Sequence, residues 1–354
     1  MITRPDAFTN AQWQGARTRL LARGFKILLG PDVGFDTVTS TLMSGKADAA
    51  FFASLPENVT PSTDDNPFFF YTTRFGNLAS TSPTARTDNN AAINVTLLLL
   101  MMSLCACVYY IITPFVRLAR RMPLSVLTPP VAYFCAIGMG FMLIEISQMQ
   151  RLMVFLGHPV YGLAVVLFTI LLFGGLGSAT LGADVPRPSA VVARVVALLT
   201  TLVVAGLLTP LLTTWARSEA IDMRILLSVL LLAPPAFCMG MMFPLGLSTW
   251  RRHSELLPFF WSANGITSMF ASVLGMVLSI EFGIANTYAL GACFYVVCAL
   301  MLVGSRQVNR LGLTADPATL SIQPTQAELA ANIGAAETRA ASPALQTRAN
   351  EVIE

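Results

Sequence analysis

The sequence predicts a mainly α-helical fold, a polytopic helical membrane bundle of about seven spans preceded by a small α/β fragment. Of its 354 residues, 55% are hydrophobic and only 12% are charged, whereas soluble proteins carry about 25% charged residues. The mean hydropathy is +0.65. A water-soluble fold cannot hide that much apolar surface, so lipid must surround most of the chain. These values exclude an ordinary soluble enzyme, a disordered protein and a secreted disulfide scaffold.

Composition divides the chain into three zones. Residues 1–90 are mixed and soluble-like, and we interpret them as the C-terminal fragment of an α/β domain. Residues 91–304 are strongly apolar and form the predicted transmembrane helical domain. Residues 305–354 are rich in Ala, Thr and Gln without an apolar stripe, which predicts a disordered tail. The first residues lack an apolar core segment, so no cleaved targeting segment is expected.

The first zone contains short elements in the order helix, strand, helix. Thr9 is expected to cap a helix that continues to Leu21, with Gly24 as its left-handed terminator. A buried-type strand is predicted at 25–29 and a second short helix at 36–43. A series this small cannot bury a core of its own. It therefore indicates the trailing edge of a larger sheet.

The apolar zone contains seven segments close to the ~20 residues that a helix needs to cross a bilayer. We predict spans at about 92–114, 128–150, 160–183, 190–214, 225–247, 260–282 and 285–304. Trp215, Trp250 and Trp261 stand at span ends, where interfacial anchors are expected. Pro234 and Pro235 are expected to kink the fifth span.

Glycines gather on the second and third spans, where they predict close helix packing, or alternatively a hinge. They are Gly138, Gly140, Gly174, Gly175, Gly177 and Gly182.

Arginines in the loops predict the orientation of the bundle. Eight of them follow the first, third, fifth and seventh spans, namely Arg117, Arg120, Arg121, Arg187, Arg251, Arg252, Arg306 and Arg310. The opposite loops carry Arg217 and Arg224, offset by Glu219 and Asp222. Because positive residues favour the cytoplasmic side, the C-terminus is expected inside and residues 1–90 outside.

A stripe of polar residues marks the end of the second span. Glu145, Gln148 and Arg151 recur at intervals of three and wind slowly along one side of the helix. An ionised carboxylate in the bilayer costs several kcal/mol unless it is paired or faces water. Two interpretations follow. Glu145 either accepts a cationic or proton-coupled ligand, or pairs with an arginine or a polar neighbour within the bundle.

Two further residues complete the candidate intramembrane polar site. His158 precedes Pro159 between the second and third spans and is either an interfacial turn residue or a proton relay. Asn264 opens the sixth span and either lines a cavity or bonds a neighbouring helix. Only one other histidine exists, His253, and all six cysteines lie in apolar runs. We therefore predict no catalytic and no metal-ligating residue. The small net charge of +3 gives no reason to expect a nucleic-acid partner.

Four stretches carry a family resemblance that covers about residues 1–304. They are TDDNPFFFY at 63–71, the run at 140–178 that begins GFMLIEISQMQRL, MGMMFPLG at 239–246 and FFWSANGITSMFASVLG at 259–275. Together they resemble bacterial polytopic proteins that carry a spermidine-synthase-like domain of the class I methyltransferase fold. In TDDNPFFFY the aspartates are expected to form a turn, and Phe68, Phe69 and Phe70 to anchor the soluble part at the membrane surface.

The resemblance implies aminopropyltransferase-like or methyltransferase-like ancestry and a place in the bacterial inner membrane. No position in this sequence matches the family's cofactor loop or catalytic carboxylate, and residues 1–90 contain no Gly-rich phosphate-binding turn. We therefore expect no cofactor, and no binding of S-adenosylmethionine or its decarboxylated form. The chain is expected to be a split or truncated member of that family.

Three functions remain open at this level. The first is an integral membrane module, an anchor or scaffold of a spermidine-synthase-like assembly without a complete active site of its own. The second is a transporter-like unit for a small cationic solute such as a polyamine, with Glu145 as acceptor. The third is an enzyme completed by a separate chain that supplies the missing methyltransferase-like half. The lipid bilayer is the one partner common to all three.

Overall fold

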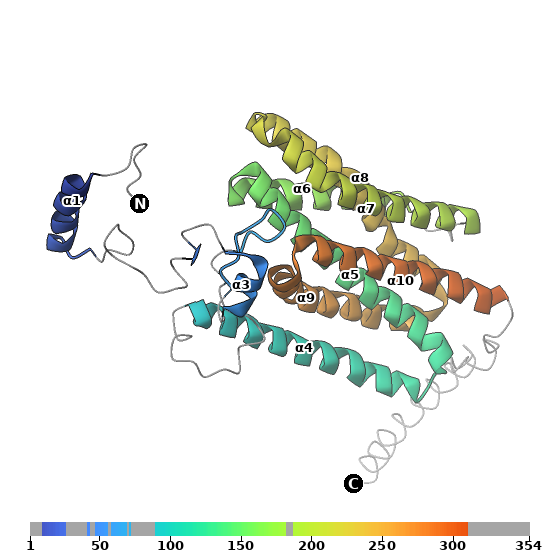
Figure 1. The fold of residues 1–354 in the computed structure, drawn as a ribbon. Helices are drawn as coiled ribbons and strands as arrows, with labels where there is room; N and C mark the ends of the chain where they lie inside the picture. The colour runs from blue at the N-terminus through green and yellow to red at the C-terminus, as the bar shows by residue number, and fades with distance from the viewer. Residues whose placement is uncertain are drawn as a thin grey trace, which may run out of the picture.

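The computed structural model describes residues 9–25, 41–42, 47–55, 58–68, 71, 89–181 and 187–310. These residues form a mainly α-helical bundle, as predicted (Figure 1). Within them there is no strand, and one isolated antiparallel bridge joins Thr63 to Asn66.

Seven long helices build the bundle, and all are long and apolar enough to cross a membrane. They are α4 (Asn89–Ala119), α5 (Leu124–Leu156), α6 (Pro159–Ala179), α7 (Pro188–Trp215), α8 (Ile221–Thr249), α9 (Leu257–Phe282) and α10 (Ile284–Arg310). Short 3-10 turns, η3 (Ala216–Ser218) and η4 (Arg251–Leu256), follow α7 and α8. The seven predicted spans are thus confirmed. α10 continues to Arg310, beyond the predicted start of the tail at 305, and the rest of that tail lies outside the described residues.

The first predicted helix is confirmed as α1 (Asn10–Ala22). The Thr9 side chain accepts the backbone N–H of Gln12, and the Gln12 side chain bonds back to the Thr9 N–H, which is a capping box. Gly24 adopts a φ of 78°, the left-handed conformation that ends the helix. No residue of α1 is buried, and the helix stands apart from the bundle in Figure 1.

A second short helix, α3 (Ala49–Ser54), was not predicted from the sequence. Its signal is Asp48, whose carboxylate accepts the N–H of Phe51 at 2.7 Å. The predicted strand at 25–29 and helix at 36–43 lie outside the described residues except at Phe25, Thr41 and Leu42.

The centre of the bundle is α5, which packs against α6, α8, α9 and α10. Gly157, with a φ of 75°, ends α5, and Pro159 begins α6 after a turn of two residues. The largest core cluster gathers aromatic rings around Tyr133, whose hydroxyl donates to the carbonyl of Met242 at 2.8 Å.

Trp250 belongs to this aromatic core and corrects one sequence expectation. The residue is only 7% exposed, and its ring centroid lies 5.0 Å from that of Tyr133. It is therefore a core residue and not an interfacial anchor. Trp215 and Trp261 are exposed at their helix ends, as anchors should be.

Glycines bring α6 and α8 into direct backbone contact, as the glycine-rich third span predicts. A Cβ at Gly177 would overlap the carbonyl of Phe237, and a Cβ at Gly240 would overlap the backbone of Gly174. Gly138 makes a similar approach of α5 to α9, where a Cβ would lie 2.5 Å from the carbonyl oxygen of Asn264. These contacts support the packing interpretation of the glycines.

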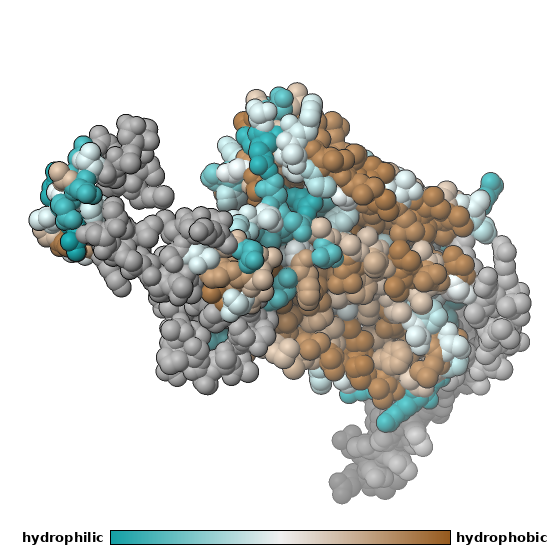
Figure 2. Space-filling model, viewed as in Figure 1, coloured by the Kyte–Doolittle hydropathy of each residue, from teal (hydrophilic) through white to brown (hydrophobic). Residues whose placement is uncertain are grey.

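The surface of the bundle separates into an apolar flank and polar ends. Figure 2 shows hydrophobic side chains covering the sides of the long helices, with hydrophilic side chains gathered at the helix ends. The exposed apolar residues include Leu207, Leu211 and Leu171, each on a different turn or helix. This pattern is that of helices whose sides face lipid. The largest hydrophilic area in this view lies at the end of the bundle that carries the start of α8.

Candidate functional site

The segment before the bundle is bound to one end of it through a turn that we call the junction loop, residues 63–66. The backbones of Thr63 and Asn66 bond each other in both directions, at 3.2 and 3.0 Å, so the predicted turn is confirmed. Asp64 and Asp65 stand at its tip. This turn places both carboxylates against the ends of helices that are remote in sequence.

Asp65 connects the loop to two helices at once. Its carboxylate forms an ion pair with Arg151 near the end of α5, and it also accepts the N–H of Ala285 at 2.8 Å. The Asp65 carbonyl accepts the N–H of Ile284 at 2.9 Å. Because these are the first free N–H groups of α10, Asp65 caps that helix and places its charge at the positive end of the helix dipole.

Gly283 makes this cap possible. It connects α9 to α10 with a φ of 90°, and a Cβ there would lie 2.5 Å from a carboxylate oxygen of Asp65. The side chain of Asn66 adds a hydrogen bond of 3.3 Å to the carbonyl of Ile280. The junction loop therefore fits closely into the corner between α9 and α10.

Asp64 makes a second and weaker attachment. It forms an ion pair with Arg217 of η3, and the two side chains are 57% and 64% exposed. Exposed ion pairs contribute about 0–1 kcal/mol. Arg151, the partner of Asp65, is only 12% exposed. The Asp65 attachment, which combines a half-buried ion pair with two backbone bonds, is therefore the stronger of the two.

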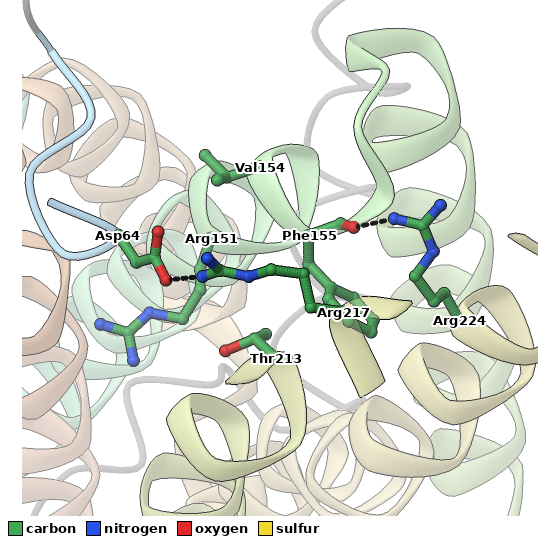
Figure 3. A pocket seen from close by; sticks show the side chains of 7 residues that line it. All are labelled: Asp64, Arg151, Val154, Phe155, Thr213, Arg217 and Arg224. Carbon is green, nitrogen blue, oxygen red and sulfur yellow. Dashed lines mark hydrogen bonds and ion pairs between the residues drawn. The ribbon is translucent and has the colours of Figure 1, made fainter. Parts of the chain in front are cut away.

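Behind the junction loop lies a pocket of about 250 Å³ that we call the arginine pocket. Its walls are Asp64, Arg151, Val154, Phe155, Thr213, Arg217 and Arg224 (Figure 3). The three arginines come from α5, η3 and α8. Figure 3 shows Arg217 extended toward Asp64 and the guanidinium of Arg224 turned toward the carbonyl of Phe155.

Gln148 lies one turn before Arg151 and bonds across to α7. Its side-chain amide donates to the hydroxyl of Thr209 at 3.3 Å, in a buried contact. Gln148 and Thr209 line a small cavity of about 50 Å³, together with Arg151 and Tyr288. The Tyr288 hydroxyl donates to the carbonyl of Leu202 at 2.7 Å. Gln148 thus acts as an interhelical connector between α5 and α7.

Glu145 is separate from this group. Its side chain is 9% exposed and lines neither cavity, and no residue in the described parts of the chain gives it a hydrogen bond or an ion pair. The arginine of its own stripe, Arg151, pairs with Asp65 instead. The structure therefore joins Gln148 and Arg151 in one site and leaves the two interpretations of Glu145 open.

The last two candidates occupy structural positions. His158 is exposed and caps α6, where its Nδ1 accepts the N–H of Val160 at 3.3 Å. This geometry supports its interpretation as a turn residue. Asn264 is half-buried, and its carbonyl accepts the hydroxyl of Thr267 at 3.0 Å beside Gly138. Its place at the contact of α9 with α5 suits helix packing and not the wall of either cavity near the junction loop.

The chemistry of the site is that of charge recognition. Its functional groups are guanidinium and carboxylate groups, and within the described ranges no three His, Cys, Asp or Glu side chains come together as metal ligands would. Arginine presents a planar fork of N–H donors that fits carboxylate and phosphate oxygens. The arrangement can therefore hold anionic groups, as it holds the carboxylates of Asp64 and Asp65.

Sequence reasoning did not find the roles of Asp65, Arg217 and Arg224. The available signal was the orientation rule itself. Arg217 and Arg224 are exceptions to the arginine asymmetry, and their guanidinium groups attract carboxylates. A pair of aspartates precedes the first span on that same side, so charge complementarity would have connected them.

No protein family, curated protein or solved structure matches this chain. The resemblance to spermidine-synthase-like polytopic proteins consequently stays a prediction from the sequence.

Proposed function

We propose that this chain is the membrane module of a spermidine-synthase-like assembly in the bacterial inner membrane, where it anchors a soluble domain and has no complete active site of its own. The observation that supports it most is the attachment of the junction loop. Asp65 binds Arg151 of α5 and caps α10, so the segment that leads into the bundle is fixed to helices far along the chain. A flexible linker would need no such contacts.

The attachment has the strength that an anchor requires. A charge-assisted hydrogen bond to a partly buried group contributes about 1.5–3 kcal/mol, and the helix dipole adds about 0.3–1 kcal/mol. Asp64 and Arg217 add at most about 1 kcal/mol. These contributions keep the loop bound most of the time. A soluble domain that continues from residues 1–90 would then have a defined position against the membrane.

The orientation follows from the arginine asymmetry and belongs to the same proposal. Arg151, Arg217 and Arg224 lie at the end of the bundle opposite the eight loop arginines, and two of these three are paired with aspartates. The eight arginines place their end in the cytoplasm, and the junction loop outside. Reporter fusions after Arg310 and within residues 75–90 should give opposite sides. Signals from one side would overturn the orientation.

Hydrogen exchange measures the attachment directly. Asp65→Ala removes the carboxylate that accepts the Ala285 N–H, so exchange at the start of α10 and within 58–68 is expected to rise by about tenfold or more. Asp64→Ala is the matched control, since it removes a neighbouring carboxylate that contacts no helix start. Unchanged exchange in Asp65→Ala would contradict the anchoring role of the junction loop.

Glu145 keeps the transporter alternative in view. Its carboxylate is buried and has no cationic partner in the described part of the chain. A cationic solute that crosses the bundle could therefore bind to it. Protein in liposomes is expected to show no saturable uptake of labelled spermidine above protein-free vesicles. If the parent chain takes up spermidine and Glu145→Gln abolishes that uptake, the anchor proposal is wrong and the transporter alternative holds.

The third alternative, an enzyme completed by a separate chain, is tested by transfer activity. The purified chain, supplied with S-adenosylmethionine or its decarboxylated form and a polyamine, is expected to give no product. Its sequence has no cofactor loop that could bind either molecule. Product formed by this chain alone would contradict both the anchor and the split-enzyme proposals.

A further inference from the structure

The arginine pocket holds more positive charge than the junction loop neutralises. Three guanidinium groups stand in its walls. Arg217 is paired with Asp64, and Arg151 with Asp65. Arg224 has no carboxylate partner among the residues that the structure describes. The positive charge of Arg224 is thus not neutralised by a carboxylate. It stands in a partly enclosed space, where its attraction for an anion is stronger than in bulk water.

Arg224 is fixed in place without being neutralised. One of its terminal nitrogens donates to the carbonyl of Phe155 at 2.9 Å, and its guanidinium carbon lies 6.0 Å from the centre of the Phe155 ring. Both contacts orient the group and leave its charge. Asp222, the acidic residue in the first turn of the same helix, is exposed and does not line the pocket.

Two buried donors in this wall also lack acceptors. The Nε atoms of Arg151 and Arg224 are buried and have no hydrogen-bond partner among the described residues. A buried N–H without an acceptor is unfavourable, because folding removed the water that would have satisfied it. These two Nε atoms are enclosed by protein, so a ligand in the pocket meets the terminal N–H groups of the arginines and their excess positive charge, and both suit a ligand rich in acceptor oxygens.

We infer that the arginine pocket binds a phosphate group. Arginine forks match the oxygens of phosphate with parallel, charge-assisted hydrogen bonds. The volume of about 250 Å³ lies below the ~300–1,000 Å³ of sites for drug-sized ligands, so the group is small. The pocket stands at the end of the bundle, where both a free phosphate ion and the headgroup of an anionic lipid can reach it.

Asp64 competes with the phosphate for Arg217. The Asp64–Arg217 pair is exposed on both sides, and such pairs are weak. A bound phosphate takes Arg217 over and releases Asp64, whereas the stronger attachment through Asp65 stays in place. The site shares Asp64, Arg151 and Arg217 with the attachment of the junction loop, but it does not require that a soluble domain be anchored. We therefore expect that removal of the Asp64 carboxylate tightens phosphate binding, and that removal of the Asp222 carboxylate, which does not line the pocket, leaves it unchanged.

Titration calorimetry with inorganic phosphate, on the full chain in an uncharged detergent, tests this expectation. Asp64→Asn is expected to tighten binding by about two- to fivefold, since it frees Arg217. Asp222→Asn is the matched control, because it changes the net charge equally but lies outside the pocket, and it is expected to change nothing. Arg224→Gln is expected to weaken binding by about tenfold or more, and Arg120→Gln, in the turn after α4 at the other end of the bundle, to leave it unchanged.

A second measurement identifies the source of the phosphate. The chain is placed in nanodiscs of phosphatidylcholine with and without phosphatidylglycerol, and the lipid retained is measured by native mass spectrometry. Retention of phosphatidylglycerol that Asp64→Asn raises and Arg224→Gln lowers assigns the site to a headgroup, while calorimetric binding alone assigns it to the free ion. Since Asp64→Asn increases affinity, misfolding cannot imitate its effect. The absence of both signals, or equal effects of Asp64→Asn and Asp222→Asn, would overturn the proposal.

Discussion

The contact between α6 and α8 can be tested with a single methyl group. Gly177→Ala places a Cβ 2.8 Å from the carbonyl carbon of Phe237, and closer still to its oxygen. Ordinary van der Waals contact begins near 3.4 Å. Because the obstacle is backbone, no side chain can rotate away, and the two helices must separate by about one ångström or more. Overpacking of this kind costs about 1–3 kcal/mol.

Gly175→Ala is the matched control on the same helix. A Cβ at Gly175 meets nothing within 4 Å. Alanine is a better helix former than glycine by up to about 1 kcal/mol, and this gain is common to both variants. The difference between them therefore isolates the packing cost, and Gly177→Ala is expected to be less stable than Gly175→Ala by about 1–3 kcal/mol.

The assay is unfolding of both variants in mixed micelles by titration with sodium dodecyl sulfate, followed by circular dichroism. Gly175→Ala should unfold at the same or a higher detergent fraction than the parent chain, and Gly177→Ala at a lower one. Equal unfolding midpoints for the two variants would refute the close approach of α6 to α8.

Two further predictions use the same assay. Glu145→Gln is expected to leave the free energy of unfolding unchanged or raise it, because Glu145 is buried without a partner in the described parts of the chain; a loss of about 3–5 kcal/mol, typical of a broken buried ion pair, would reveal a cationic partner. Trp250→Ala is expected to cost about 3–5 kcal/mol because it removes a buried ring, whereas Trp215→Ala, 72% exposed, should cost far less in micelles. Similar losses in the two tryptophan variants would contradict the core position of Trp250.

The sequence was sufficient for the seven long helices and α1, though not for α3, because the signals of those helices are local. Apolar runs of membrane length predicted all seven spans, and Thr9 and Gly24 predicted both ends of α1. Trp250 was misassigned for a physical reason. Its place at a helix end suits an interfacial anchor equally well, and only the packing of α8 against α5 shows that its ring faces inward.

The candidate site was predicted only in part, because it depends on contacts between distant residues. Spacing on one helix grouped Glu145, Gln148 and Arg151, of which the structure places Gln148 and Arg151 in the wall of one small cavity and Glu145 in neither cavity. The partner of Arg151 is Asp65, 86 residues away, and no periodicity within a helix can indicate a residue at that distance. Charge asymmetry between loops was the only sequence signal that could connect residues so far apart in the chain.

The cap on α10 makes the order of synthesis matter. Asp65 and Ala285 are 220 residues apart in the chain. At a translation rate of about 5–20 residues per second, Asp65 waits about 11–44 s before its α10 partner exists. Arg151 follows Asp65 by 86 residues and can hold it only once it has been made, and a nascent chain that stops before α10 leaves the Asp65 carboxylate without its backbone partners. Closure of the junction loop on α10 therefore distinguishes a completed bundle from an unfinished one.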